Sequence, residues 1–241
     1  MGELTATSTH LSKYDVSTGE ASGVMSVQGG CLVGNDLYSF MVDTTFTSYK
    51  MIKTDMTTGD SVVVATNLSL GHANDATYNP HEDVIVVADG NDGSKLYKIT
   101  LDGNYSVTTV DISNTSTGIW AIAYDATNKQ YIGAGHSTIH YYDSNFNLLR
   151  TVEYSLSQGY KGQGALTDGV YFYLLESTTT NDNNNLLVFD LVTGEKIATV
   201  DIGITRESEN IVYKDGKFFV TCNNTGWTGM EVYEVTVSTA S

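Results

Sequence analysis

Side chains that suit the binding of a polar ligand recur in this sequence at intervals of about 45 residues. The first positions of five similar segments are Gln28, His72, Gly118, Gln163 and Glu207. Two residues further on, the same segments carry Gly30, Asn74, Trp120, Ala165 and Glu209. The amides, carboxylates and imidazole supply hydrogen-bond donors and acceptors, and the indole supplies a face for stacking. This combination suits a sugar, because its hydroxyl groups and its C–H face need both kinds of contact.

Three acidic residues at or beside these positions, Asp75, Glu207 and Glu209, can also do chemistry. If Glu207 or Glu209 faces Asp75 across a shared site, the two carboxyl groups can serve as acid and base or nucleophile on a glycosidic bond. The same oxygens, with His72 nearby, can bind a calcium ion. In the simpler alternative, these polar groups only satisfy one another and ordered water. The sequence leaves these alternatives open and assigns no catalytic residue and no cofactor.

Residues next to these segments extend the candidate site. Arg206 precedes Glu207, where it forms either an internal ion pair or a clamp on a ligand. Trp227 lies in a loop between Gly and Thr residues, where it either marks a recognition surface or caps the core. The predicted ligand-binding residues are Gln28, His72, Asn74, Asp75, Trp120, Gln163, Arg206, Glu207, Glu209 and Asn210.

A repeating pattern of short β-rich runs must position these residues. Each segment is followed by a turn and a second run, within residues 36–42, 83–88, 130–134, 170–175 and 217–222. A third run and usually a short fourth one come next, with Gly, Asn and Asp at the reversals and no helical period. Four short strands in each of five repeats predict an all-β fold, a five-bladed β-propeller with four-stranded antiparallel blades. Its blades start near residues 28, 72, 118, 163 and 207.

Propeller geometry explains why the candidate residues converge. The first strand of each blade lines the central channel, so equivalent positions of five repeats form rings around the axis. The residues between the two rings are Gly29, Ala73, Ile119, Gly164 and Ser208. Four of these five are small, as expected where innermost strands crowd together.

The N-terminal segment, residues 1–27, is predicted to close the ring by joining the last blade. The runs 11–16 and 21–27 resemble the outer half of a blade. Both 11–16 and 231–237 have the pattern of a third strand, so the sequence does not decide which run forms the outer edge.

Composition limits the classes of partner. The chain has 241 residues, predicted to form a single domain (1–241), and 28 acidic residues against 12 basic ones give a net charge of −16. This charge repels phosphate backbones and anionic lipids, so we expect no nucleic acid as a partner. No run reaches the roughly 18 apolar residues of a membrane span, so no membrane insertion is expected. Cys31 and Cys222 are expected to pack as small apolar residues, or to pair if ring closure brings them together.

Several strings resemble one family of propeller domains. They are Gln28-Gly-Gly-Cys, Gly71-His-Ala-Asn-Asp-Ala-Thr-Tyr-Asn-Pro80, Ile119-Trp-Ala-Ile-Ala-Tyr-Asp125, Gln163-Gly with Thr167-Asp-Gly, and Arg206-Glu-Ser-Glu-Asn-Ile211. The family occurs in surface or secreted proteins of Gram-positive gut bacteria and in tail or receptor-binding proteins of their phages. The first repeat departs from the family pattern, because Val33-Gly34-Asn35 stands where Thr-Asp-Gly is usual. The resemblance implies an extracellular, cell-surface or virion location, with virion or surface proteins as further partners, and no catalytic assignment.

Together these observations predict a non-enzymatic recognition module that binds a cell-surface carbohydrate at the mouth of the axial channel. Two alternatives remain. The first is a glycan-cleaving hydrolase or lyase that uses axial carboxylates. The second is a scaffold for protein interactions, since a fold does not fix a function. No nucleophile elbow, phosphate loop or zinc-protease motif is present in the sequence.

Overall fold

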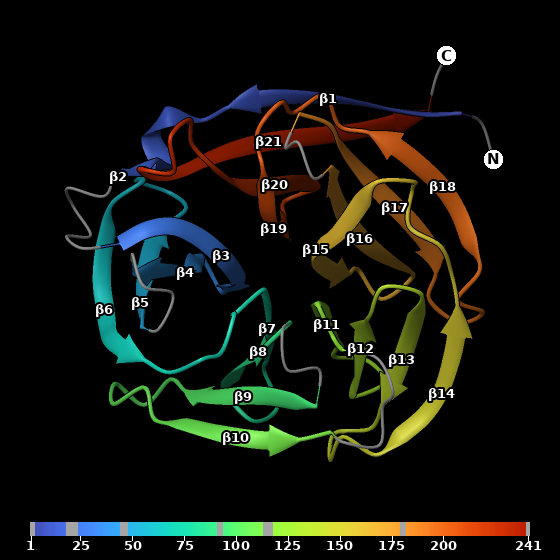
Figure 1. Cartoon of the computed structure of the whole chain (residues 1–241), viewed down its shortest axis with the longest axis horizontal. Coiled ribbons are helices and arrows are strands. Elements are labelled where there is room, and N and C mark those ends of the chain that lie inside the picture. Colours follow the sequence, from blue (N-terminus) through green and yellow to red (C-terminus); the bar gives the residue numbers. More distant parts are fainter. Residues whose placement is uncertain are drawn as a thin grey trace.

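The described part of the chain consists almost entirely of β-strands. The computed structural model describes residues 3–17, 24–43, 48–90, 94–112, 118–178 and 182–239, and these contain 21 strands and one 3-10 helix, η1 (Ser12–Tyr14). The strands form five antiparallel sheets arranged around a central axis (Figure 1). The predicted five-bladed β-propeller is confirmed.

Four of the blades consist of four consecutive strands, with the first strand innermost. The first blade contains β3 (Val24–Val33), β4 (Asp36–Asp43), β5 (Tyr49–Asp55) and β6 (Ser61–Leu68). The second contains β7 (Asp75–Asn79), β8 (Val84–Ala88), β9 (Lys95–Thr100) and β10 (Val107–Asp111). The third contains β11 (Ala121–Asp125), β12 (Gln130–Ala134), β13 (Thr138–Tyr142) and β14 (Leu148–Glu153). The fourth contains β15 (Tyr160–Thr167), β16 (Tyr171–Thr178), β17 (Asn184–Asp190) and β18 (Lys196–Asp201).

The fifth blade closes the ring by combining the two ends of the chain. It contains β19 (Ser208–Lys214), β20 (Lys217–Asn223) and β21 (Gly229–Thr239), and β1 (Leu4–His10) forms its outer edge (Figure 1). β1 is antiparallel to β21, with Leu4 opposite Thr239 and His10 opposite Tyr233. Neither of the two runs considered for the outer edge, 11–16 and 231–237, forms it, because residues 4–10 do. Residues 231–237 lie in the third strand, whereas 11–16 contain η1 and the start of the two-residue strand β2 (Val16–Ser17), which also pairs with β21.

One part of the closing segment lies elsewhere than predicted. Residues 24–27 belong to β3, the innermost strand of the first blade, and not to an outer half-blade; residues 18–23 lie outside the described residues. β3 accommodates this length because its pairing with β4 shifts register between Val24 and Ser26 and again between Val27 and Gly30. Such bulges insert unpaired residues and bend the strand.

A tight turn in the fifth blade shows how the sequence reverses its strands. Lys214 and Lys217 pair across β19 and β20, so only Asp215 and Gly216 lie between them. Both residues have positive φ, at 52° and 82°. This is the two-residue hairpin turn that Asp-Gly favours, because its backbone twist matches that of the strands.

The hydrophobic core lies between neighbouring blades. In β4, Leu37 and Met41 face the cluster shared with the fifth blade, whereas Tyr38, Phe40 and Val42 face the cluster shared with the second blade. This alternation follows from the two-residue period of a strand. Both faces of β4 are therefore buried, and three further clusters fill the remaining spaces between adjacent blades.

Glycines allow the innermost strands to approach one another closely. A Cβ on Gly29 would lie 2.5 Å from Cα of Asp75, and a Cβ on Gly164 would lie 2.8 Å from Cα of Asn210. These contacts join β3 to β7 and β15 to β19 at the axis. The small residues predicted between the two rings are thus required by backbone packing.

The two cysteines do not form a disulfide. Cys31 and Cys222 are both buried with free thiols, and they belong to different core clusters, one between the first two blades and one between the last two. They pack as small apolar side chains. No helix in the described ranges has the length and apolar character needed to cross a membrane.

Candidate functional site

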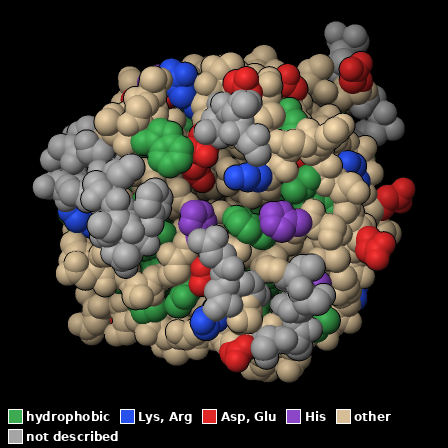
Figure 2. All heavy atoms as spheres, viewed as in Figure 1, with side chains coloured by type: hydrophobic (Ala, Val, Ile, Leu, Met, Phe, Trp, Pro, Cys, Tyr) green, Lys and Arg blue, Asp and Glu red, His purple; other side chains and the backbone are tan. Residues whose placement is uncertain are grey.

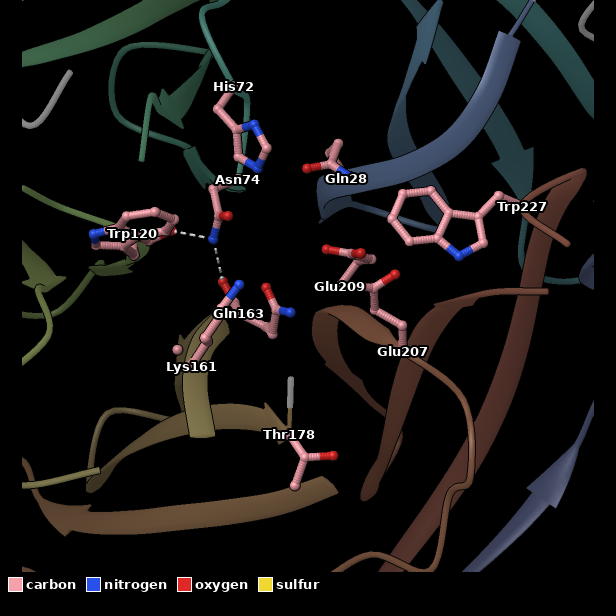
Figure 3. Close-up of a pocket in the computed structure, with 11 residues that line it drawn as sticks. Gln28, His72, Asn74, Trp120, Lys161, Gln163, Thr178, Glu207, Glu209 and Trp227 are labelled. Atoms are coloured by element: carbon pink, nitrogen blue, oxygen red, sulfur yellow. Dashed lines mark hydrogen bonds between the residues drawn. The ribbon is translucent and has the colours of Figure 1, made fainter. Parts of the chain in front are cut away.

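A cavity of about 240 Å³ lies where the five innermost strands begin. We call it the axial cavity. All five blades contribute to its walls, with residues from β3, β15, β16 and β19 and from the segments that precede β7, β11 and β19 (Figure 3). Its lining residues are Gln28, His72, Asn74, Trp120, Lys161, Gly162, Gln163, Thr178, Glu207, Glu209 and Trp227.

The structure brings together seven of the ten predicted ligand-binding residues in this lining. These seven are Gln28, His72, Asn74, Trp120, Gln163, Glu207 and Glu209. Asp75, Arg206 and Asn210 do not line the cavity, although each is adjacent in the sequence to a residue that does.

Two indole rings form opposite walls of the cavity. Trp120 and Trp227 lie on opposite sides of it in Figure 3. The Trp120 ring contacts His72, with ring centroids 6.4 Å apart, and His136, with centroids 4.8 Å apart. Trp227 is 37 % exposed at its side of the cavity. The indoles thus offer two apolar faces to a ligand that enters between them.

Asn224 holds the Trp227 loop in place. The backbone N–H of Trp227 donates to the carbonyl of Asn224 at 3.1 Å, and the N–H of Thr228 donates to Oδ1 of Asn224 at 2.7 Å. Trp227 itself has a positive φ of 55°. The turn that presents this indole is therefore fixed by hydrogen bonds from its own residues.

Asn74 connects three blades below the cavity. Its side-chain amide nitrogen donates to the carbonyl oxygens of Trp120, at 2.8 Å, and of Gln163, at 3.1 Å. Its backbone N–H donates to the carbonyl of Ala88 at 2.9 Å. These bonds fix the orientation of the amide, so a ligand meets Asn74 in a preformed position (Figure 3).

Two carboxyl groups and one amide form the most acidic wall. The side-chain nitrogen of Asn223, on β20, donates to Oε1 of Glu209 at 2.7 Å and to Oε2 of Glu207 at 3.2 Å. The oxygen of the same amide accepts the backbone N–H of Val27 at 2.9 Å, which ties the last blade to the first. Glu207 and Glu209 are therefore held close together on one side of the cavity.

Burial raises the pKa of both carboxyl groups in this wall. Desolvation raises the pKa of Glu209 well above its usual value, and the charge of Glu207 raises it further, whereas Lys161 and Asn223 act in the opposite direction. Desolvation also raises the pKa of Glu207. A carboxyl group that keeps its proton donates a hydrogen bond as well as accepting one. The wall thus offers both functions to a ligand hydroxyl.

His72 favours its neutral form in this site. Desolvation lowers the pKa of its imidazole, and the nearby Lys161 lowers it further, while Asp89 has the opposite effect. The backbone N–H of His72 donates to Oδ1 of Asp89 at 3.0 Å. A neutral imidazole carries one donor and one acceptor nitrogen, which again suits a neutral polar ligand.

Asp75 binds backbone groups of neighbouring blades and does not line the cavity. It is fully buried, and its Oδ2 accepts the backbone N–H groups of Ile122, at 2.7 Å, and of Ala165, at 2.9 Å. It therefore links the second blade to the third and fourth. Because Oδ2 binds backbone amides and the residue lies outside the cavity lining, the structure does not bring Asp75 opposite Glu207 or Glu209.

Arg206 and Asn210 also lie outside the lining of the axial cavity. Arg206 forms an ion pair with Glu231 on β21, with Nε 3.4 Å from Oε2, and its guanidinium also donates to the carbonyl of Thr205 at 3.2 Å. The internal ion pair considered for Arg206 thus exists, with Glu231 as its partner. Asn210 is fully buried on β19, where its backbone packs against Gly164.

The described residues contain no group of three or more His, Cys, Asp or Glu side chains arranged to hold a metal ion. The calcium site considered for Asp75, Glu207 and Glu209 therefore has no geometric support in this part of the chain, since Asp75 faces backbone amides.

The face that carries the centre of the ring combines aromatic and charged groups. Figure 2 shows histidine, hydrophobic, basic and acidic side chains near the centre of this view. Sequence reasoning missed Lys161, Thr178 and Asn223. Lys161 lies two residues before Gln163, Thr178 ends the second strand of its blade, and Asn223 ends the second strand of the last blade.

Comparisons with known proteins support the fold. No protein-family model matches the sequence, and no curated protein matches it significantly. Among solved structures, glutaminyl cyclase from Myxococcus xanthus superposes with a TM-score of 0.69 at 11% identity, covering 99% of this chain and 100% of that one. A protein of unknown function from Bacteroides thetaiotaomicron gives 0.54 at 12% identity, with 98% and 77% covered. A DUF4221-family protein from Bacteroides vulgatus gives 0.52 at 9% identity, with 100% and 98% covered. At these identities the likeness establishes the propeller fold alone.

Proposed function

We propose that this protein is a recognition module that binds one unit of a carbohydrate in the axial cavity. The observation that carries the proposal is the placement of Trp120 and Trp227 on opposite sides of a cavity whose other walls are amides, carboxyl groups, an imidazole and a hydroxyl. Stacking on an indole suits the C–H face of a sugar ring, and the polar walls suit its hydroxyl groups.

The size of the cavity favours a single sugar unit. Its volume of about 240 Å³ is below the roughly 300–1,000 Å³ typical of pockets for drug-sized ligands. A terminal residue of a glycan fits this size better than an internal stretch of a long chain.

Charge favours a neutral or basic sugar. Lys161 is the one basic side chain in the lining, against Glu207 and Glu209, and the whole chain has a net charge of −16. A polyanionic glycan would be repelled by this field. We therefore propose a neutral or amino sugar, presented on a cell surface, as the ligand.

The proposed setting is extracellular, on a bacterial surface or a phage tail, with other surface or virion proteins as further partners. Its support is the resemblance of strings such as Gln28-Gly-Gly-Cys and Thr167-Asp-Gly to propeller domains of those proteins. The acidic composition agrees with this setting, because it disfavours nucleic acid and anionic lipid as alternatives.

A glycan array followed by calorimetry with the best ligand tests the proposal. We expect Trp120→Ala and Trp227→Ala each to weaken binding by about tenfold or more, with Tm changed by less than about 4 °C. Tyr213→Leu, which alters an aromatic residue outside the axial cavity, is the matched control and should leave sugar affinity unchanged. Retained affinity in both tryptophan variants would remove the axial cavity as the binding site.

A glycan-cleaving enzyme is the second candidate, and the raised pKa of Glu209 beside a second carboxyl group is the observation that favours it. A glycosidase needs its two carboxyl groups on either side of the scissile bond. Here Glu207 immediately precedes β19, Glu209 lies in it, and both accept from one amide, that of Asn223. This arrangement supports binding more than cleavage.

Turnover assays separate these candidates. We expect no product from a polysaccharide panel, nor from a glutaminyl substrate, which is included because of the fold likeness to glutaminyl cyclase. Turnover that disappears in Glu209→Gln would establish an enzyme in place of a binding module. A scaffold would show neither turnover nor sugar affinity.

A further inference from the structure

A second cavity, of about 270 Å³, lies at the opposite end of the axis. We call it the tyrosine cavity. Its walls come from the ends of the same innermost strands whose beginnings surround the axial cavity, namely β3, β7, β11, β15 and β19. Its lining residues are Cys31, Leu32, Ala76, Thr77, Tyr78, Pro80, Tyr124, Ala126, Ala165, Leu166, Thr167, Ile211, Val212 and Tyr213.

The chemistry of this lining differs from that of the axial cavity. Among the residues that the structure describes, it includes no Asp, Glu, Lys, Arg or His. Three phenol rings, those of Tyr78, Tyr124 and Tyr213, stand among aliphatic side chains and two threonines. Tyr213 is 41 % exposed, so a ligand can reach its ring from solvent.

The electrostatic potential around the three tyrosine rings is negative. The hydroxyl of Tyr78 donates to Oδ1 of Asp83 at 2.9 Å. After desolvation, Asp83 is the next cause that raises the pKa of Tyr78, followed by Cys31 and Tyr38, and Glu82 and Asp125 raise the pKa of Tyr124. Lys98 offsets part of the Glu82 charge through an ion pair at 2.5 Å.

One basic side chain next to the cavity is also paired with an acidic one. Lys214, next to Tyr213, forms an ion pair with Asp215 at 2.8 Å. The whole chain carries a net charge of −16. An anion is therefore disfavoured at this end of the axis, and a cation is attracted to it.

We propose that the tyrosine cavity binds a small organic cation with a quaternary ammonium group. Aromatic faces attract such cations through the ring quadrupole. Among the described lining residues no carboxylate can pair with a primary ammonium, and only neutral groups can accept its N–H bonds, so it would lose part of its hydrogen bonding on entering. A quaternary ammonium has no N–H groups and makes apolar contacts through its methyl groups. The cavity thus suits its charge and its lack of hydrogen-bond donors.

Choline and its neutral carbon isostere, 3,3-dimethyl-1-butanol, are the probes that test this proposal. The two molecules have the same shape and differ in charge. NMR titration of the whole protein should show choline binding at least about tenfold more tightly, with shifts at the ends of the innermost strands, and weakening as salt increases. Equal affinities, or binding of neither probe at millimolar concentration, would overturn the proposal.

Three variants locate the binding. Tyr213→Leu should reduce choline affinity by about fivefold or more, whereas Tyr213→Phe, which keeps the ring, should retain it. Trp120→Ala, at the other end of the axis, should leave choline affinity unchanged. Loss of choline binding in Trp120→Ala, or full binding in Tyr213→Leu with unchanged Tm, would contradict the assignment to the tyrosine cavity.

Discussion

The cavities at the two ends of the propeller axis share the same five innermost strands but differ in their lining. Charged and polar side chains surround the axial cavity, whereas tyrosine and aliphatic side chains surround the tyrosine cavity. At the axial cavity, His72, Trp120 and Glu207 lie in the segments that lead into β7, β11 and β19. At the tyrosine cavity, the lining lies largely within the strands, for example Tyr124 in β11 and Tyr213 in β19. Gln28, Gln163 and Glu209 lie inside strands, but each falls at a register shift, where regular pairing is interrupted and a polar side chain can face the axis. Within a strand, successive residues alternate between two faces, and in these blades both faces pack against apolar neighbours.

A tightly packed layer separates the two ends. Asp75 binds the backbone N–H groups of Ile122 and Ala165, and Gly29 and Gly164 let neighbouring strands approach closely. This layer allows the two cavities to differ, because polar groups of one end are not exposed to the other. Variants in the layer should disturb both cavities, whereas variants in a wall should disturb only one.

The largest effect is expected for Asp75→Ala. This change leaves the N–H groups of Ile122 and Ala165 buried without an acceptor, and each such group costs roughly 1–3 kcal/mol. We expect the free energy of unfolding, measured by urea titration, to fall by about 2–6 kcal/mol. Both cavities should lose ligand affinity together.

Asp75→Asn is the control for that change. Its side-chain oxygen still accepts backbone N–H bonds, so we expect a smaller loss of stability than in Asp75→Ala. If both variants are as stable as the wild type, the carboxylate does not hold the blades together and the two ends are not separated in this way.

A medium effect is expected for Gly164→Ala. The new Cβ would lie 2.8 Å from Cα of Asn210, a backbone atom that cannot move aside independently. Overpacking of this kind costs about 1–3 kcal/mol. Thermal and urea unfolding should show this loss.

The same strand supplies the control for Gly164→Ala. At Gly162, an added Cβ would meet only Cδ1 of Leu174, at 3.8 Å, which is ordinary contact. Gly162→Ala should therefore change the free energy of unfolding by less than about 1 kcal/mol. Equal losses in the two variants would show that crowding at the axis is not the cause.

The fold and much of the axial cavity were predictable because the repeat aligns equivalent positions. Gln28, His72, Gln163 and Glu207 occupy matching places in four repeats, and a propeller brings such places together. The separation of Asp75 from Glu209 was not predictable in this way. The two side chains belong to the same ring region in the sequence, but only the fold shows which carboxylate binds backbone amides.

Bulges explain further differences between sequence and structure. β15 shifts register between Gly162 and Ala165, and β19 does so between Ser208 and Asn210. The two-residue alternation of side chains along a strand is therefore interrupted at the positions that face the axis. No turn residue in the sequence marks these register shifts. Thr178 and Trp227 reach the cavity from other strands and loops, which the alignment of innermost strands does not sample.

The smallest effect, and the one that best distinguishes the two ends, is a change in pH dependence in Glu209→Gln. Because desolvation raises the pKa of Glu209, the folded protein keeps a proton that the unfolded chain releases above its pKa of about 4.3. This group therefore stabilises the fold fully below that pH, and the contribution is lost as pH rises through the raised folded pKa. Glu207 raises the pKa as well, while Lys161 and Asn223 lower it. We expect the fall in Tm from pH 5 to pH 8 to be smaller in Glu209→Gln than in the wild type.

The exposed Glu195→Gln is the matched control for charge, and it should keep the wild-type dependence of Tm on pH. Glu209→Gln should also leave choline binding at the tyrosine cavity unchanged, because the packed layer lies between them. An unchanged pH dependence in Glu209→Gln would mean that the buried carboxyl group does not hold its proton, so the acidic wall would offer acceptors alone. In that case the axial cavity would favour a ligand rich in donors, and an amino sugar would be preferred over a neutral one.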